Sequence, residues 1–449
     1  MRISRLCHYF ERKRVGAFYH SLTMRMVFAS PKDAQALKDN DWGNIRSPNL
    51  VSKMRDLNLL VPDQYDESQE IETVCRPLDT PPEIRVMYIM LTEHCNFDCT
   101  YCFIRKPLPA DHKPTFMSNQ TVKRAIDRYA DCLERCRSDK EKVIIFYGGE
   151  PLLNLTALKT ALKYIKTLQE NGRLPESLKL CLNTNGSLVT RGIAGYLHKH
   201  GVNVAVSLDG REANHDVYRV YHDKRGTFQE TMRGFYYLKE AGVPLTISCT
   251  TGPHNIKAMQ EITRWFAEEL GIRAFGWNIL SNPPGRRIAN RSYSHKITAT
   301  ALKCYDYCLE HQVYEDSIGR IASAFLKNRV RPGNCAACGE QMVVSPRGNI
   351  GICYAFLGAG TYFDHAVEQP FRPEEDPAFA EWKRRSPLNI EECRSCAALG
   401  ICGGGCPYEG YQENGSIWDL DRNHCLHARG VLEWLIWKIY RLSRKGVGA

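Results

Sequence analysis

The sequence lacks several features that would place it in whole classes of protein. No apolar run approaches the roughly 18 residues that a membrane-spanning helix requires, and the start, residues 1–8, lacks the apolar stretch of a secretory signal. The chain has no internal repeat, no low-complexity segment and no recognisable nucleic-acid-binding module. We therefore expect a cytoplasmic protein that binds neither a membrane nor a nucleic acid.

Acidic residues are scarce in residues 1–55, which hold 11 Lys and Arg against four acidic residues. Residues 56–72 reverse this balance, with six acidic residues and no basic one, and the whole chain has a net charge of +10. The local basic excess fits two interpretations, attraction of an acidic partner or an ordinary solvated face.

Cysteine, by contrast, is abundant, with 19 in a chain of 449 residues. This length predicts two to four domains at roughly 100 to 200 residues each. Thiols stay reduced in the cytoplasm, so many cysteines in spaced clusters indicate metal or iron–sulfur ligation rather than disulfides.

From residue 86 the pattern alternates between buried strands and amphipathic helices, which is typical of a parallel sheet. Helices are expected near 120–136, 156–170, 190–200, 228–241 and 257–270. Six strand–helix units predict an α/β fold with a partial (β/α)6 TIM-like barrel, whose chemistry lies at the carboxyl ends of the strands. The expected strands are 86–91, 143–147, 178–182, 202–208, 245–250 and 272–280.

The pattern of residues 1–75, before this barrel, predicts a small separate module. Residues 17–28 predict one strand, and residues 32–38 and 48–60 predict short helices. After the barrel, residues 335–425 are rich in Cys, Gly and Pro, which is typical of a small domain held by metal clusters, and residues 431–442 predict an amphipathic helix.

Three cysteines directly follow the first barrel strand: Cys95, Cys99 and Cys102. A 4Fe–4S cluster takes four ligands, so a loop that supplies three leaves one iron free to bind another molecule. The alternative is a structural zinc site with a distant fourth ligand.

Further motifs follow the next strands. They are Gly148-Gly149-Glu150-Pro151, Asn183-Thr184-Asn185-Gly186 and Ser207-Leu208-Asp209-Gly210, with Arg219 nine residues after the last of them. Glycine allows close approach of the backbone to a ligand, whereas Asn-Gly alone is most often a turn.

Together these elements resemble the radical S-adenosylmethionine (SAM) superfamily. The resemblance implies that Cys95, Cys99 and Cys102 hold a 4Fe–4S cluster whose free iron binds SAM. It also implies SAM contacts at the strand ends, with the GGEP motif on the methionine amine and the later positions on the ribose and carboxylate. The implied contacts are Gly148, Gly149, Glu150, Pro151, Asn183, Asn185, Ser207, Asp209 and Arg219.

The spacing of the C-terminal cysteines resembles the SPASM domain, a cluster-bearing extension of radical SAM enzymes. The resemblance implies one auxiliary 4Fe–4S cluster on Cys335, Cys338, Cys353 and Cys406, and another on Cys393, Cys396, Cys402 and Cys425. Two zinc sites are the alternative, because paired cysteines at this spacing also suit tetrahedral zinc.

The N-terminal module resembles the small winged-helix module with which peptide-modifying enzymes grip the leader of a precursor peptide. There the leader adds a strand to a sheet edge; a structural N-terminal cap is the alternative. The expected organisation is 1–75 for this module, 84–285 for the barrel, 286–334 for a connecting region, 335–428 for the SPASM domain and 429–449 for a C-terminal helix.

The resemblance implies an enzyme that makes a 5′-deoxyadenosyl radical and oxidatively modifies a ribosomally made peptide, for example by a thioether or C–C cross-link. Its implied partners are the precursor peptide or protein and an external electron donor such as flavodoxin or ferredoxin. One alternative is an anaerobic sulfatase-type maturase that forms formylglycine, although such relatives carry an acidic residue where this chain has Tyr354. The other is a non-catalytic peptide-binding protein with structural clusters or zinc. The sequence assigns no catalytic acid or base.

Overall fold

The computed structural model describes residues 1–105, 108, 111–281 and 291–445. The chain forms two compact units that we describe separately. The first unit comprises Met1–Thr80, Ile318–Cys335 and Arg384–Ala449, and the second comprises Pro81–Ser317 and Ala336–Lys383. The predicted boundary between barrel and connecting region, at residues 285 and 286, lies outside the described residues. Within the described part of the chain, no helix is long and apolar enough to cross a membrane.

The second unit is built on one large sheet with the order β12-β11-β10-β9-β8-β7-β6-β13-β14-β15. The strands from β12 to β13 in this order run parallel, and β14 and β15 follow in antiparallel pairing. Its strands are β6 (Val86–Met90), β7 (Val143–Tyr147), β8 (Lys179–Thr184), β9 (Val202–Ser207), β10 (Leu245–Thr251), β11 (Ala274–Ile279), β12 (Tyr314–Glu315), β13 (Gln341–Val344), β14 (Asn349–Gly351) and β15 (His365–Ala366).

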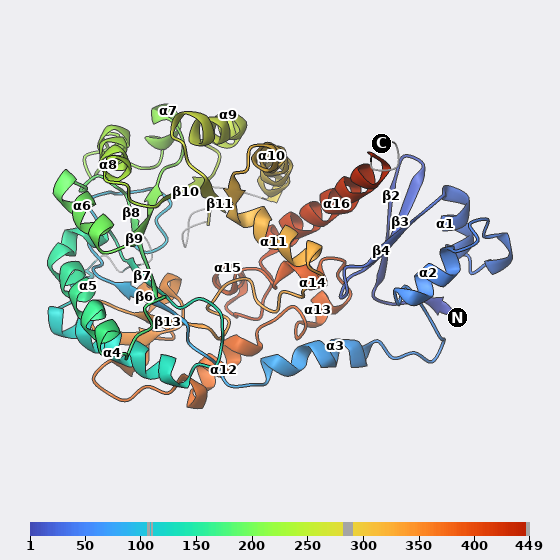
Figure 1. Cartoon of the computed structure of the whole chain (residues 1–449), viewed down its shortest axis with the longest axis horizontal. Coiled ribbons are helices and arrows are strands. Elements are labelled where there is room, and N and C mark those ends of the chain that lie inside the picture. Colours follow the sequence, from blue (N-terminus) through green and yellow to red (C-terminus); the bar gives the residue numbers. More distant parts are fainter. Residues whose placement is uncertain (106–107, 109–110, 282–290, 446–449) are drawn as a thin grey trace. The chain divides into compact units, whose positions relative to one another are not determined.

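Helices alternate with these strands, and α4, α5, α6 and α8 cover the outer face of the parallel sheet (Figure 1). The six predicted barrel strands are confirmed, and the ends of each lie within two residues of the expected bounds. The helices are α4 (Asn119–Arg135), α5 (Leu155–Glu170), α6 (Arg191–Lys199), α7 (Glu212–His215), α8 (Phe228–Glu240), α9 (Met259–Arg264), α10 (Arg291–Glu310) and α12 (Pro377–Arg384).

Burial alternates along the barrel strands and separates their two faces. In β7, β8 and β9 every second residue is buried toward the helices, whereas the residues between them are partly exposed on the inner face. Tyr147, Asn183 and Ser207 are the last inner-face residues of these three strands. Successive side chains of a strand point to opposite faces, so these three residues face the inside of the barrel near its carboxyl edge.

The first unit contains a three-stranded antiparallel sheet in the order β2-β3-β4 and a two-stranded pair of β1 with β5. Residues Phe18, Val27, Ala34, Leu37 and Met54 belong to one buried cluster beneath this sheet. The elements are β1 (Arg2–Ile3), β2 (Cys7–Arg12), β3 (Val15–His20), β4 (Met26–Ala29), α1 (Pro31–Lys38), α2 (Leu50–Asp56), β5 (Leu60–Val61), α3 (Ser68–Cys75), α11 (Asp316–Leu326), α13 (Glu391–Arg394), α14 (Leu399–Cys402), α15 (Pro407–Asn414) and α16 (Arg422–Lys445).

The structure of this unit differs from the sequence expectations at four points. The single strand expected over 17–28 is two strands, because the chain reverses around Met24, which has a φ of 59°. The strand β2 was missed, and the helix expected over 48–60 ends at Asp56, followed by Asn58 with a φ of 56°. The C-terminal helix begins at Arg422, nine residues before its expected start, so Cys425 lies in its first turn.

Candidate active site at the carboxyl edge of the barrel

The loop with the first three cysteines is held against a later segment of the chain. Asp98 N donates to Val220 O at 2.7 Å and Thr100 N donates to Tyr218 O at 3.0 Å. Phe97 forms a bridge with Tyr221, and their rings meet edge to face with centroids 5.1 Å apart. Backbone pairing therefore fixes the loop over the carboxyl edge of the sheet.

The three thiols of this loop lie close enough to act on one another electrostatically. Burial raises the pKa of Cys95, and the charges of Glu150, Cys99 and Cys102 raise it further. Burial also raises the pKa of Cys99 to about 12, opposed by Arg219. A set of three adjacent thiols in one loop fits a cluster that needs three protein ligands. In the described residues, no group of three His, Cys, Asp or Glu side chains is arranged to hold a single metal ion.

The two glycines of the GGEP motif allow a close approach between two parts of the chain. Gly148 has a φ of 142°, and a Cβ atom there would lie 2.3 Å from Thr92 O. A Cβ atom at Gly149 would lie 2.1 Å from His94 O. The sequence suggested that these glycines make room for a ligand; in the structure they make room for the backbone of residues 92–94, which leads into the cysteine loop.

Glu150, the next residue of the motif, joins the ends of β7 and β8. Its carboxylate accepts hydrogen bonds from Leu152 N at 3.0 Å, Thr184 Oγ1 at 2.8 Å and Asn185 N at 2.8 Å. Burial raises its pKa to about 7, although the three hydrogen bonds oppose this shift. Pro151 is buried at the start of a short 3-10 helix. The side chain of Glu150 therefore holds the strand ends together.

Asn185 connects the end of β8 to the cysteine loop. Its Nδ2 donates to Asn96 Oδ1 at 2.9 Å, and its Oδ1 accepts from Ser187 Oγ at 2.7 Å. Asn96 Nδ2 in turn donates to Ser187 Oγ at 2.9 Å. These three polar side chains form a closed set beside Cys95, and the sequence analysis gave no role to Asn96 or Ser187.

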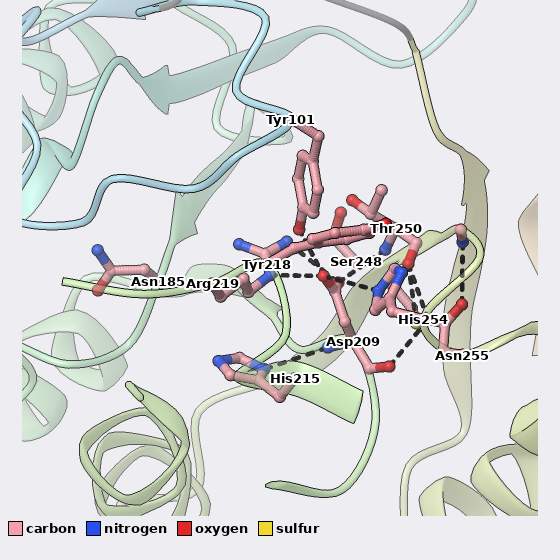
Figure 2. Close-up of polar contacts among 12 residues, drawn as sticks. Tyr101, Asn185, Asp209, His215, Tyr218, Arg219, Ser248, Thr250, His254 and Asn255 are labelled. Carbon is pink, nitrogen blue, oxygen red and sulfur yellow. Dashed lines mark hydrogen bonds and ion pairs between the residues drawn. The ribbon is translucent and has the colours of Figure 1, made fainter. Parts of the chain in front are cut away.

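Asp209 is the centre of a buried polar network (Figure 2). Its carboxylate accepts a hydrogen bond from Tyr101 Oη at 2.5 Å, pairs with Arg219 Nε at 3.0 Å, and accepts from Thr250 N at 2.9 Å. Burial by itself would raise the pKa of Asp209, but Arg219 and His254 outweigh it and hold the pKa well below its usual range. Asp209 and Arg219 thus anchor the cysteine loop through Tyr101.

Sequence reasoning missed three members of this network. Tyr101 lies between Cys99 and Cys102, and the Arg219 guanidinium also stands over its ring, 5.4 Å from the centroid. His254 Nε2 lies 3.5 Å from Asp209 Oδ2, and Asn255 Nδ2 donates to Asp209 O at 2.9 Å. The only signal available was position, since His254 and Asn255 stand three and four residues after Thr251, the last residue of β10.

Asn183 and Ser207 differ from the other implied SAM contacts. Both lie on the inner face of the barrel, and neither side chain takes part in a hydrogen bond within the described part of the chain. Their polar groups are therefore available to a ligand, whereas Glu150, Asn185, Asp209 and Arg219 are already engaged with the protein.

An aromatic surface lies on the other side of the barrel interior. Tyr88 of β6 and Tyr147 of β7 have ring centroids 5.9 Å apart. Tyr354 stacks on Tyr147 at 5.1 Å and packs 4.8 Å from Tyr88, while Phe103 of the cysteine loop lies 5.8 Å from Tyr354. All four rings are only partly buried. The interior therefore has a polar side on β8 and β9 and an aromatic side on β6 and β7.

The structure brings together the four cysteines Cys393, Cys396, Cys402 and Cys425 in the first unit. Burial raises the pKa of Cys393 to about 12, and the charges of the other three raise it further. Several donors surround this set: Arg429 hydrogen-bonds to Cys396, Gly404 N hydrogen-bonds to Cys402, and His424 Nε2 lies 3.0 Å from the backbone oxygen of Cys402. Four thiols with donors directed at their sulfurs fit the ligand set of an iron–sulfur cluster.

The other implied auxiliary set is divided between the units. Cys335 and Cys406 belong to the first unit, and Cys338 and Cys353 belong to the second. Their role as cluster ligands stays a prediction.

Parts of this chain are similar in sequence to known proteins. The model of the radical SAM superfamily matches residues 89–266. The radical SAM cyclopropyl synthase TigE of Paramaledivibacter caminithermalis is 23% identical over 361 residues, covering 78% of this chain and 73% of TigE. A serine-type anaerobic sulfatase-maturating enzyme of Bacteroides thetaiotaomicron is 22% identical over 361 residues, covering 73% of this chain and 84% of that enzyme.

Two groups of solved structures share the fold. Native anSMEcpe with bound AdoMet matches with a TM-score of 0.68 and 18% identity, over 80% of this chain and 99% of that one. Streptococcus suis SuiB bound to its precursor peptide SuiA matches with a TM-score of 0.57 and 15% identity, over 94% of this chain and 99% of SuiB.

The chain carries a radical SAM domain over residues 89–266, and its similarity to known maturases points to an enzyme. Its cofactors are a 4Fe–4S cluster and SAM. In the described structure, the cluster and SAM fit at the carboxyl edge of the sheet, where the cysteine loop meets the ends of β7, β8 and β9.

Proposed function

We propose that this radical SAM enzyme oxidatively modifies a peptide and holds two auxiliary 4Fe–4S clusters. The observation that carries the proposal is the set of four adjacent thiols, Cys393, Cys396, Cys402 and Cys425, in the unit that also contains the N-terminal sheet. An enzyme that only cleaves SAM has no need of a further cluster, whereas an oxidation must pass an electron from the substrate to an acceptor. Cys335, Cys338, Cys353 and Cys406 complete the proposal as ligands of the other auxiliary cluster.

The residues at the carboxyl edge of the barrel would have different roles in binding the cluster and SAM. Cys95, Cys99 and Cys102 would hold three irons of the cluster, and the network of Tyr101, Asp209 and Arg219 would keep their loop in place. Asn183 and Ser207 would bind polar groups of SAM, together with the backbone of the GGEP motif. When bound, SAM and its cluster supply the abstraction of a hydrogen atom from an unactivated C–H bond.

The aromatic side of the barrel would receive the substrate. Tyr88, Tyr147 and Tyr354 offer partly exposed ring faces that can pack against a side chain and keep water from it. A peptide substrate is also supported by the related folds, since SuiB and anSMEcpe have been solved with bound peptides. The N-terminal sheet β2-β3-β4 would grip the leader by adding it as a strand at an edge. Flavodoxin or ferredoxin would supply the electron that starts the reaction.

Formylglycine formation is the second candidate, because sulfatase-maturating enzymes are among the relatives. The position directly after Cys353 argues against it. The residue there is Tyr354, stacked on Tyr147 with an interplanar angle of 26°, so no carboxylate occupies the place expected for the base.

The test uses reconstituted, reduced protein with SAM and a library of short peptides. We expect 5′-deoxyadenosine from the protein, and a modified peptide that has lost the mass of two hydrogen atoms for each new bond. A hydrazine probe for aldehydes distinguishes the two candidates, because formylglycine reacts with it and a cross-link does not. Absence of 5′-deoxyadenosine from protein with full iron content would contradict the proposal.

A further inference from the structure

Tyr19 lies on the face of strand β3 that points away from the core of the N-terminal sheet. Its neighbour Phe18 belongs to that core, and successive residues of a strand point to opposite faces. Tyr19 packs instead on Phe325 of α11, with ring centroids 5.8 Å apart and an angle of 13°. The ring is therefore fixed on the side of the sheet that faces the rest of the first unit.

The hydroxyl group of Tyr19 is buried without a hydrogen-bond partner in the described residues. Tyr19 is fully buried, with an exposed fraction of 0%. Burial raises the pKa of Tyr19, and the charge of Cys396 raises it further, so this cysteine lies within electrostatic reach of the hydroxyl. A buried donor that stays unsatisfied destabilises the folded protein. Such a group calls for an acceptor that is present in the working protein.

The chain after β3 is fastened to the segment between Cys396 and Cys402. Gly400 N donates to Ser21 O at 2.8 Å, and a Cβ atom at Gly400 would lie 2.6 Å from the same oxygen. Leu22 and Cys393 belong to one buried hydrophobic cluster. The position of Tyr19 relative to Cys396 is therefore fixed by the backbone on both sides.

The helix that carries Cys425 packs on the same face of the sheet. Phe28 of β4 lies 5.0 Å from Tyr440 and 6.4 Å from Trp437 of α16, measured between ring centroids. The same helix carries Arg429, which hydrogen-bonds to Cys396. The N-terminal sheet and the set of four cysteines are thus connected through α16 as well as through Tyr19.

Hydrogen bonds to the sulfur atoms of a cluster stabilise its more negative, reduced form and raise its reduction potential. Cys396 and Cys402 already receive such bonds from Arg429 and from Gly404 N. We propose that Tyr19 is a positioning residue of the auxiliary cluster on Cys393, Cys396, Cys402 and Cys425, and that its hydroxyl donates a hydrogen bond to a sulfur atom at Cys396 when the cluster is bound. This inference rests on the second auxiliary cluster of the proposed function.

The proposal makes the N-terminal sheet part of the redox site. The strand that supplies Tyr19 pairs with β4, the edge strand of the sheet, in the register Tyr19 to Met26. A peptide added at that edge would lie one strand away from the donor.

The test is a redox titration of the full chain, reconstituted with iron and sulfide and followed by electron paramagnetic resonance. For Tyr19→Phe we expect the potential of one auxiliary cluster to fall, by about 59 mV if the lost bond changes the equilibrium tenfold. The matched control is Tyr9→Phe on the neighbouring strand β2, which removes the same atom from a hydroxyl that donates to Glu11 at 3.1 Å on the surface. Phe325→Leu keeps the hydroxyl but removes its stacking partner, so we expect a smaller shift in the same direction.

Two results would overturn the inference: an unchanged potential in Tyr19→Phe, or an equal shift in Tyr9→Phe. The potential of the SAM-binding cluster is expected to stay unchanged in every variant. Iron analysis of the unsubstituted protein distinguishes failure of this inference from failure of the proposed function. If the auxiliary cluster does not exist, the unsubstituted protein already lacks the iron and the paramagnetic signal of that cluster.

Discussion

Replacing Asp209 by Asn should remove much of the stability of the barrel edge. The Asp209 side chain is fully buried and that of Arg219 is 9% exposed, with 3.0 Å between Oδ2 and Nε. Asn has no charge, so the guanidinium would be left buried without a counter-ion. Removing one partner of a buried ion pair typically costs about 3–5 kcal/mol. For a unit of this size that corresponds to a fall in melting temperature of roughly 6–20 °C.

The assay is thermal and denaturant unfolding of the reconstituted protein, with Asp223→Asn as the matched control. Asp223 pairs with Arg225 at 2.7 Å, but both side chains are more than half exposed, so its loss should cost at most about 1 kcal/mol. Replacing both members of the buried pair, Asp209→Leu with Arg219→Met, should recover part of the lost stability. A melting temperature of Asp209→Asn equal to that of Asp223→Asn would refute the reasoning.

Three further predictions concern the clusters and the pH dependence. Cys99→Ala should abolish formation of 5′-deoxyadenosine while the auxiliary iron stays bound; product formation in this variant would remove the assignment of the cysteine loop. Cys393→Ala should lower the yield of folded protein more than it lowers SAM cleavage, because this thiol belongs to the small hydrophobic cluster around residues 388–399; soluble, well-folded variant protein would count against this. Burial raises the pKa of Glu150 to about 7, so its protonated form contributes stability that is fully present below about pH 4 and is lost as the pH rises through about 7. The contribution of Glu150 to the free energy of unfolding should therefore fall by about 3 kcal/mol over that range. The difference in unfolding free energy between the wild type and Glu150→Gln should change by this amount between about pH 4 and about pH 7.

The sequence predicted the strands of the barrel because their signal is local. Each has a short apolar run followed by an amphipathic helix, as Val143–Tyr147 is followed by α5. The reversal between β3 and β4 was missed because no Gly or Pro marks it; Met24 takes up the left-handed conformation instead, supported by its N–H to His20 O at 2.8 Å. The pairing of strands, which is a property of the folded chain, decides that turn.

The sequence predicted those site residues that form a motif at short spacing along the chain. It did not predict contacts between residues that only folding brings together. Cys95, Cys99 and Cys102 stand in one loop, so their motif is visible in the sequence. Tyr101 and Asp209 are 108 residues apart, and only the folded chain shows their hydrogen bond. The same holds for Ser21, directly after β3, and Gly400, because only the folded chain shows the hydrogen bond between their backbones.

Iron, acid-labile sulfide and zinc per chain, measured on protein purified and reconstituted without oxygen, test the central claim most directly. The account predicts about twelve iron and about twelve sulfide per chain, because each of three clusters contributes about four of each. About four irons with two zincs would contradict it, since the C-terminal cysteines would then hold structural zinc and no auxiliary cluster would be present to accept an electron.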